Sequence, residues 1–177
     1  SEELGVMRLS LWSTRDCRRS VGELARAGRS VVVLDQEPAG SGAARRNAGY
    51  LGRVLKKSLP ALMAKLGDEK GIAIYRELGE AFTGTVDFIQ REGIDCKFTR
   101  HGRYIAANSA KHYDAMAKEL EAMRRHLGYP YEMVPEREQR REFGADRYHG
   151  GAMIPDLAAI HPGLYHLGLI ERAKAAG

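Results

Sequence analysis

The chain has 177 residues, of which 44% are hydrophobic and 29% charged, and its formal net charge is +5. This length and composition predict a globular fold of one to one and a half domains with a core of ordinary size. We expect no membrane span, because no apolar run approaches about 20 residues. We expect no disulfide framework, because Cys17 and Cys96 are isolated. No basic-then-apolar signal pattern begins the sequence, so the expected location is cytoplasmic.

The positive charge is concentrated in one segment. Between Pro38 and Gly67 there is no acidic residue, while six basic residues occur there: Arg45, Arg46, Arg53, Lys56, Lys57 and Lys65. Such a segment suits a phosphate-bearing small molecule or a nucleic acid. A solvated basic face explains it as well, and we favour that interpretation for the lysines.

The first predicted elements are a helix and a buried strand. Leu24 and Ala25 precede Gly28, which suits the left-handed position after a helix end. Residues 31–34 form the continuous apolar run Val-Val-Val-Leu, which is typical of a parallel strand covered on both faces. A helix, a glycine turn and a buried strand predict the second half of a βαβ unit.

The rest of the chain is predicted to be mostly helical, with short strands. Apolar residues repeat at helical spacing from Tyr75 to Ile89, and Gly93 ends that helix. A second helix is expected over Ser109–Leu127, with Ser109 as its N-cap. A third starts at Pro162 and extends to Gly177. Strands are predicted at Asp95–Thr99, Arg103–Ala107 (after a His101-Gly102 turn), Tyr131–Val134 and Gly150–Ile154, and a short charged helix at Glu136–Phe143.

The segment after the buried strand has the chemistry of a dinucleotide site. Asp35 ends the strand, where an acidic residue holds a ribose hydroxyl in such sites; a solvated or helix-capping acid is the alternative. The loop from Gly40 to Gly49 offers small residues, backbone N–H groups and two guanidinium groups, all suited to phosphate oxygens. By contrast, Asp156, His161 and His166 match no standard metal spacing, so no metal site is expected.

On these residues the sequence resembles the FAD-dependent oxidoreductases of the D-amino-acid-oxidase type, which include glycine and sarcosine oxidases and γ-glutamylputrescine oxidoreductase-like enzymes. The resemblance rests on Leu24-Ala-x-Ala-Gly28, Val31-Val-Val-Leu-Asp35 and Gly42-Ala-x-x-Arg-Asn-x-Gly49, and continues weakly to Ile160-His-Pro162. It implies an α/β fold: a partial Rossmann-like FAD-binding domain with a partial helical and antiparallel-sheet substrate domain. The implied ranges are 1–58 for the FAD-binding unit, 59–160 for the substrate domain and 161–177 for a returning helix.

The resemblance also implies the cofactor and its contacts. FAD would be bound by Asp35, Gln36, Ser41, Gly42, Ala43, Arg46, Asn47, Ala48 and Gly49, and no residue is assigned as a catalytic base. The implied reaction is hydride removal from the carbon bearing nitrogen in a small-molecule amine or amino acid.

The sequence departs from the family in its first 22 residues. Trp12, Thr14 and Cys17 stand where the family has the three glycines of its phosphate-binding turn. One hypothesis is that this segment is translated out of frame. The C-terminal half of the family is also expected to be missing, so whether this chain alone is an enzyme stays open. The alternatives are a basic, non-enzymatic module that binds nucleic acid or other polyanions, which we do not favour, and an inert remnant that binds nothing.

Overall fold

The structure is a computed structural model that describes residues 22–31, 38, 40–53 and 55–175. These residues form two compact units, which are described here one at a time. Unit 1 holds the described residues of Ser1–Gly49 and Ile160–Gly177, together with Ile89–Lys97. Unit 2 holds Tyr50–Phe88 and Phe98–Ala159, without residue 54. The domain ranges inferred from the sequence remain a prediction.

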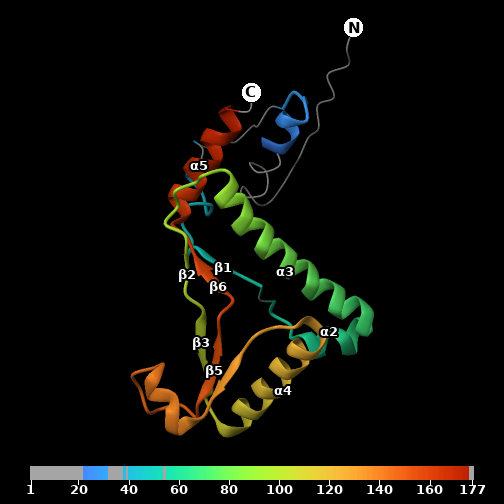
Figure 1. Ribbon diagram of the computed structural model, residues 1–177, viewed down its shortest axis with the longest axis vertical. Helices are drawn as coiled ribbons and strands as arrows, with labels where there is room; N and C mark the ends of the chain where they lie inside the picture. The colour runs from blue at the N-terminus through green and yellow to red at the C-terminus, as the bar shows by residue number, and fades with distance from the viewer. Residues whose placement is uncertain (1–21, 32–37, 39, 54, 176–177) are drawn as a thin grey trace. The chain divides into compact units, whose positions relative to one another are not determined.

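Unit 2 is built on two antiparallel sheets of three strands each (Figure 1). The strands are β1 (Tyr50–Gly52), β2 (Thr99–Arg100), β3 (Arg103–Ala106), β4 (Glu132–Val134), β5 (Gly151–Ile154) and β6 (Leu157–Ala159). The first sheet has the order β1-β6-β2 and the second the order β3-β5-β4. The chain passes from β2 directly into β3 and from β5 directly into β6. The β2–β3 segment and the β5–β6 segment therefore each contribute one strand to both sheets.

A β-bulge lies where this pair of segments passes from one sheet to the other. The N–H groups of His101 and Gly102 both donate to the carbonyl oxygen of Leu157, at 3.1 and 3.0 Å. Between the pairs Arg100–Ala158 and Arg103–Ile154, this segment has two residues and the opposite segment has three, so the ribbon bends locally. Gly102 has a φ of +67°, and a Cβ there would lie 2.8 Å from the carbonyl oxygen of Ile154, so the turn requires glycine. Asp156 lies on the opposite segment at this break.

Helices pack on both sheets of unit 2. They are α2 (Leu59–Leu66), α3 (Asp68–Arg91), of which residues up to Phe88 belong to this unit, and α4 (Ala110–Leu127). Phe82 and Val86 of α3 pack against Ala158 of the first sheet. Figure 1 shows α2 beside α4. Serine side chains begin two of them: Ser58 accepts from Ala61 N–H at 3.4 Å and Ser109 from His112 N–H at 3.1 Å. The helices and strands bury a common core that includes Leu59, Leu62, Tyr75, Met116, Leu120, Met123, Tyr129 and Ile154.

Unit 1 contains a short helix over residues 22–26, the loop 40–49 and α5 (Pro162–Ala175). Backbone hydrogen bonds tie the start of α5 to two other segments of the unit. The N–H of Ile160 donates to Gly49 at 2.9 Å, and that of His161 donates to Cys96 at 2.7 Å. The short helix is held by an ion pair of 2.6 Å between Arg26 and Glu92.

Several predicted elements are confirmed with small changes in their bounds. The helix after Ser109 ends at Leu127, with Gly128 left-handed at φ 64°. The predicted strands at 103–107, 131–134 and 150–154 correspond to β3, β4 and β5, and the helix from Pro162 is α5. The charged segment after Pro135 is a 3-10 helix, Glu136–Arg141. The predicted buried strand 31–34 lies, except for Val31, outside the described residues.

The predicted strand Asp95–Thr99 is wrong over most of its length. Only Thr99 lies in a strand, β2. Lys97 has a φ of +56°, and its N–H donates to the Asp95 carboxylate at 3.4 Å, so the side chain stabilises a turn in place of an extended backbone. Three short elements were not predicted: α2, β1 and β6.

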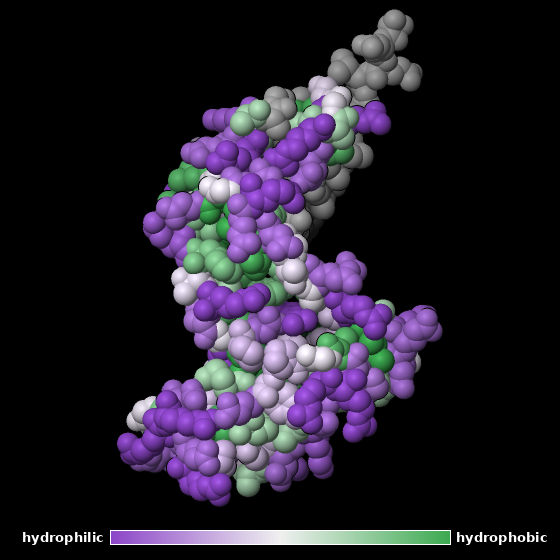
Figure 2. Space-filling model, viewed as in Figure 1, coloured by the Kyte–Doolittle hydropathy of each residue, from purple (hydrophilic) through white to green (hydrophobic). Residues whose placement is uncertain are grey.

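Figure 2 shows hydrophilic residues over most of the visible face of unit 2, with smaller hydrophobic areas between them. No helix in the described part of the chain is long and apolar enough to cross a membrane. The exposed apolar residues include Tyr50, which is 66% exposed at the start of β1.

Candidate cofactor site

The loop 40–49 is folded by short-range hydrogen bonds of its own. Successive turns are closed by Ser41 N–H to the Pro38 carbonyl at 3.0 Å and by Arg46 N–H to the Ala43 carbonyl at 3.1 Å. The Asn47 side chain completes the loop. Its amide group donates to the carbonyls of Ala43 and Ala44, both at 3.1 Å, and its oxygen accepts from Gly49 N–H at 2.9 Å. Asn47 therefore holds the loop in shape from within.

Two glycines let the loop pack tightly inside unit 1. Gly40 has a φ of +87°, and a Cβ there would lie 2.6 Å from Nε2 of His166, a buried residue of α5. Gly49 has a φ of +71° and contacts the backbone of Ile160. His161 caps α5, because its Nδ1 accepts from Leu164 N–H at 3.2 Å. The loop 40–49 thus packs against α5 and the residues that precede it.

The other side of the loop is open. Gly42, Ala43, Arg46 and Ala48 are exposed, and Ser41 is half-buried. A Cβ added at Gly42 would have no atom within 4 Å. Within the described residues, the N–H groups of Gly42 and Ala43 have no hydrogen-bond acceptor, and Arg46 forms no ion pair. This surface presents donors and positive charge to anything that docks there.

A different polar centre lies inside unit 2, beside the β-bulge. Nε of Arg53 donates to the Asp156 carboxylate, and these side chains are 24% and 8% exposed. The guanidinium carbon of Arg53 also lies 4.9 Å from the ring centre of the buried Tyr129. Gly79 of α3 makes room for it, since a Cβ there would lie 2.6 Å from Arg53 Nη1. Arg53 therefore links α3, the segment before β6 and the segment after α4.

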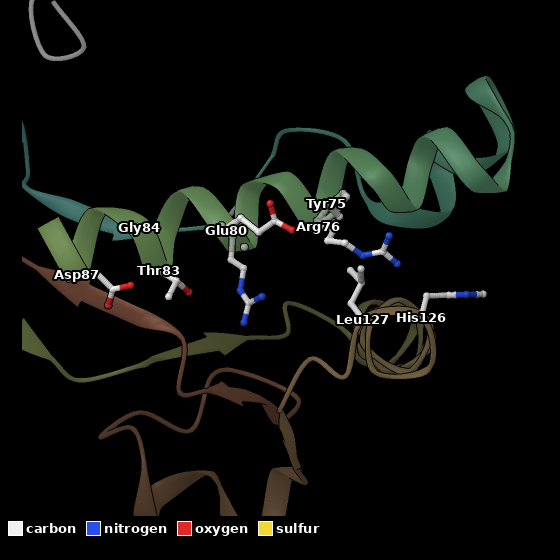
Figure 3. A pocket seen from close by; sticks show the side chains of 10 residues that line it. Tyr75, Arg76, Glu80, Thr83, Gly84, Asp87, His126 and Leu127 are labelled. Atoms are coloured by element: carbon white, nitrogen blue, oxygen red, sulfur yellow. The ribbon is translucent and has the colours of Figure 1, made fainter. Parts of the chain in front are cut away.

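An open groove of about 520 Å³ runs along α3 in unit 2 (Figure 3). Figure 3 shows Thr83 and Asp87 on α3 and Leu127 of α4 pointing toward that helix. Arg76, Glu80 and Asp87 are exposed, and their charges are of both signs. Water reaches these groups, so the groove by itself does not indicate a particular ligand.

Comparison with known proteins identifies the family. The profile of the DAO family, described as FAD dependent oxidoreductase, matches residues 22–177. The chain belongs to this family. Over 139 residues it is 28% identical to γ-glutamylputrescine oxidoreductase of Escherichia coli (strain K12), covering 78% of this chain and 32% of that protein. Over 155 residues it is 28% identical to a probable oxidoreductase, OrdL, of Rhizobium meliloti (strain 1021), covering 87% and 36%.

Solved structures of the family share the fold. Iminodiacetate oxidase from Chelativorans sp. BNC1 matches with a TM-score of 0.67 at 18% identity, covering 90% of this chain and 42% of that one. Glycine oxidase from Geobacillus kaustophilus matches with a TM-score of 0.66 at 22% identity and the same coverage. The chain thus spans about a third of the curated relatives' length. The expected fold class, α/β with a partial Rossmann-like FAD-binding domain and a partial helical and antiparallel-sheet substrate domain, is confirmed.

FAD is the cofactor of the DAO family, and the open side of the loop fits part of it. The N–H groups of Gly42 and Ala43, which have no acceptor among the residues that the structure describes, and the Arg46 guanidinium are donors of the kind that phosphate oxygens accept. Asn47 and Gly49 instead serve the loop's own fold in this structure. Asp35 and Gln36 lie outside the described residues. The nine predicted FAD contacts therefore remain a prediction, to which the structure adds this division of roles.

Glu119 of α4 is expected to make the stability of unit 2 depend on pH. Burial raises its pKa above the ordinary value of 4.5, and Arg103 opposes this increase. The folded state then binds more protons than the unfolded state, so this carboxyl group lowers stability as the pH rises above about 4.5. We expect Glu119→Gln to increase the free energy of unfolding at pH 7 and to change it little at pH 4. Urea unfolding at both pH values measures this, and an equal effect at both would contradict it.

Proposed function

We propose that this chain forms part of a flavoenzyme that oxidises a small amine or amino acid. Support comes from the family match over residues 22–177 and from the open, donor-rich side of the 40–49 loop. The names of relatives point the same way, since they include a γ-glutamylputrescine oxidoreductase, a glycine oxidase and an iminodiacetate oxidase. The observation that carries the proposal is the sequence Gly42-Ala-x-x-Arg-Asn-x-Gly49, folded as a compact loop in which Gly42, Ala43, Arg46 and Ala48 are exposed.

In this proposal the loop binds and positions FAD. Gly42 and Ala43 N–H groups and Arg46 hold phosphate oxygens, and Asn47 keeps those groups in place through its bonds inside the loop. Asp35 binds the adenosine ribose, as its place after the predicted strand implies. When bound, the flavin accepts a hydride from the carbon bearing nitrogen. No side chain of this chain is assigned to proton transfer.

We further propose that this polypeptide is inactive alone. It has Trp12, Thr14 and Cys17 where the family has phosphate-binding glycines, and it matches about a third of its curated relatives' length. Side chains in place of those glycines block the close approach of backbone to a pyrophosphate. A basic polyanion-binding module is not favoured, because the family match accounts for the same loop.

The test is the flavin content of the purified chain. We measure its visible absorbance and then follow FAD fluorescence as the chain is titrated into the free cofactor. If the 40–49 loop binds FAD, Arg46→Ala should weaken the affinity about tenfold, because it removes a charged donor. Arg137→Ala changes an arginine of unit 2 whose side chain is 82% exposed, and it serves as the matched control.

The outcomes distinguish FAD binding by this polypeptide from its membership of the family. A colourless chain with no FAD response would reject cofactor binding by this polypeptide and leave its family membership unchanged. If Arg46→Ala and Arg137→Ala weaken the affinity for FAD equally, the net charge of the chain, and not the loop, controls FAD binding. Binding of DNA with a steep salt dependence, in place of FAD, would favour the polyanion-binding module.

A further inference from the structure

A second cavity, of about 220 Å³, lies within unit 2 between α4 and the second sheet. It is smaller than the pockets of roughly 300–1,000 Å³ that take drug-sized ligands. Part of its wall is apolar: Leu55, Ile105, Met116, Leu120, Met123 and Ile154. The rest is polar or charged and includes Arg103 of β3, Glu119 of α4 and Tyr129. The cavity thus combines an apolar part with convergent polar groups, a combination found in ligand sites.

Arg103 is the cation of this cavity. Its Nε is buried and has no hydrogen-bond partner among the described residues. A buried charged donor without an acceptor is unfavourable, and structures rarely leave one unpaired. Arg53 also lines the cavity, but its Nε is already bonded to Asp156. The unmet donor at the cavity is therefore on Arg103.

The nearby acidic group, Glu119, does not bond to this donor. It forms no ion pair with Arg103 within 4 Å in the described part of the chain, although the charge of Arg103 lowers its pKa against the larger, opposite effect of burial. The other titratable groups that face the cavity are Tyr75 of α3, His112 of α4, Tyr129 and Arg53. When Glu119 is protonated, the cavity holds a net positive charge next to apolar walls.

We propose that this cavity binds a small organic carboxylate with an apolar body, held through its carboxylate by Arg103. The planar guanidinium group presents parallel N–H donors that match the two oxygens of a carboxylate. The aliphatic wall takes the apolar body, and the limited volume excludes long chains. The site lies wholly in unit 2, so its occupancy does not depend on FAD binding by the 40–49 loop.

The test uses the full chain without FAD and two ligands of the same shape. Cyclohexanecarboxylate carries the charge, and cyclohexanecarboxamide is its neutral counterpart. Saturation-transfer NMR and calorimetry measure their dissociation constants. We expect the carboxylate to bind at least tenfold more tightly than the amide. Equal affinities, or no binding of the carboxylate, would overturn the proposal.

Variants test the role of Arg103. Arg103→Gln should weaken carboxylate binding at least tenfold, while Arg103→Lys, which keeps the charge and loses the planar fork, should give an intermediate loss. The matched control is Arg100→Gln, an exposed arginine of β2 three residues away. Circular dichroism establishes whether each variant is folded. If Arg103→Gln does not fold, Arg103→Lys still tests the proposal. Unchanged binding in a folded Arg103 variant contradicts the proposal.

Glu119 supplies an independent readout. Its ionised carboxylate repels an anion in the cavity, so removing that charge should raise carboxylate affinity. Glu119→Gln should therefore bind the carboxylate more tightly than the parent chain at pH 8. Equal affinities of Glu119→Gln and the parent chain at pH 8 would contradict the assigned site. Inorganic phosphate that competes as well as the carboxylate would also contradict it, because binding would then follow charge alone.

Discussion

Asp156→Ala is expected to lower the free energy of unfolding of unit 2 by about 2–3 kcal/mol. The substitution leaves the Arg53 guanidinium without its anion beside the buried Tyr129. Breaking a fully buried ion pair costs roughly 3–5 kcal/mol, and the smaller value here reflects the 24% exposure of the Arg53 side chain. Urea unfolding monitored by circular dichroism at pH 7 measures the change.

A matched pair of substitutions isolates the effect of burial. Arg140 and Asp146 form the same kind of arginine–aspartate pair, but their side chains are 68% and 63% exposed. Asp146→Ala should therefore cost less than about 1 kcal/mol, as exposed ion pairs generally do. The cost of Asp156→Asn should lie between those of Asp146→Ala and Asp156→Ala, because asparagine retains an acceptor for Arg53. Similar costs for Asp156→Ala and Asp146→Ala would mean that the pair beside Tyr129 is no more important than a surface contact.

The helices of unit 2 could largely be predicted because their signals are local. Ser109 and Gly128 delimit α4, and the apolar repeat between them identifies its buried side. A serine cap followed by a periodic stripe requires no knowledge of the partner segments. The short strands β1 and β6 carry no such signal. They are three residues each and are defined by their pairing across more than a hundred residues of sequence.

The polar centre of unit 2 could not be predicted for the same reason. Arg53 belongs, by sequence, to a basic segment, and the spacing of Asp156 from the nearest histidines, His161 and His166, predicts no metal site. Their pairing depends on the β-bulge at Gly102 and on the absence of a side chain at Gly79. The 40–49 loop is the opposite case, because its glycines and Asn47 are adjacent in sequence and form their turns locally.

Gly49→Ala is expected to destabilise unit 1 by about 3 kcal/mol. Gly49 has a φ of +71°, which costs a residue with a Cβ roughly 1–2 kcal/mol. The new Cβ would also overlap the carbonyl oxygen of Ile160, a backbone atom that has little freedom to move. Relief of that overlap separates the loop from the start of α5 and strains the 2.9 Å bond between Ile160 N–H and Gly49. Hydrogen exchange at Ile160 and along α5, together with urea unfolding, measures the loss.

Gly42→Ala is the control that separates folding from cofactor binding in the same loop. A Cβ at Gly42 has no atom within 4 Å and its φ is not positive, so stability should change by less than about 0.5 kcal/mol. If FAD lies on the open side of the loop, the added methyl group should nevertheless weaken FAD binding, because it occupies space that the backbone presents to the phosphates. Gly49→Ala would then reduce FAD binding only through loss of folded unit 1. A Gly42→Ala chain that binds FAD as well as the parent would place the cofactor away from this face.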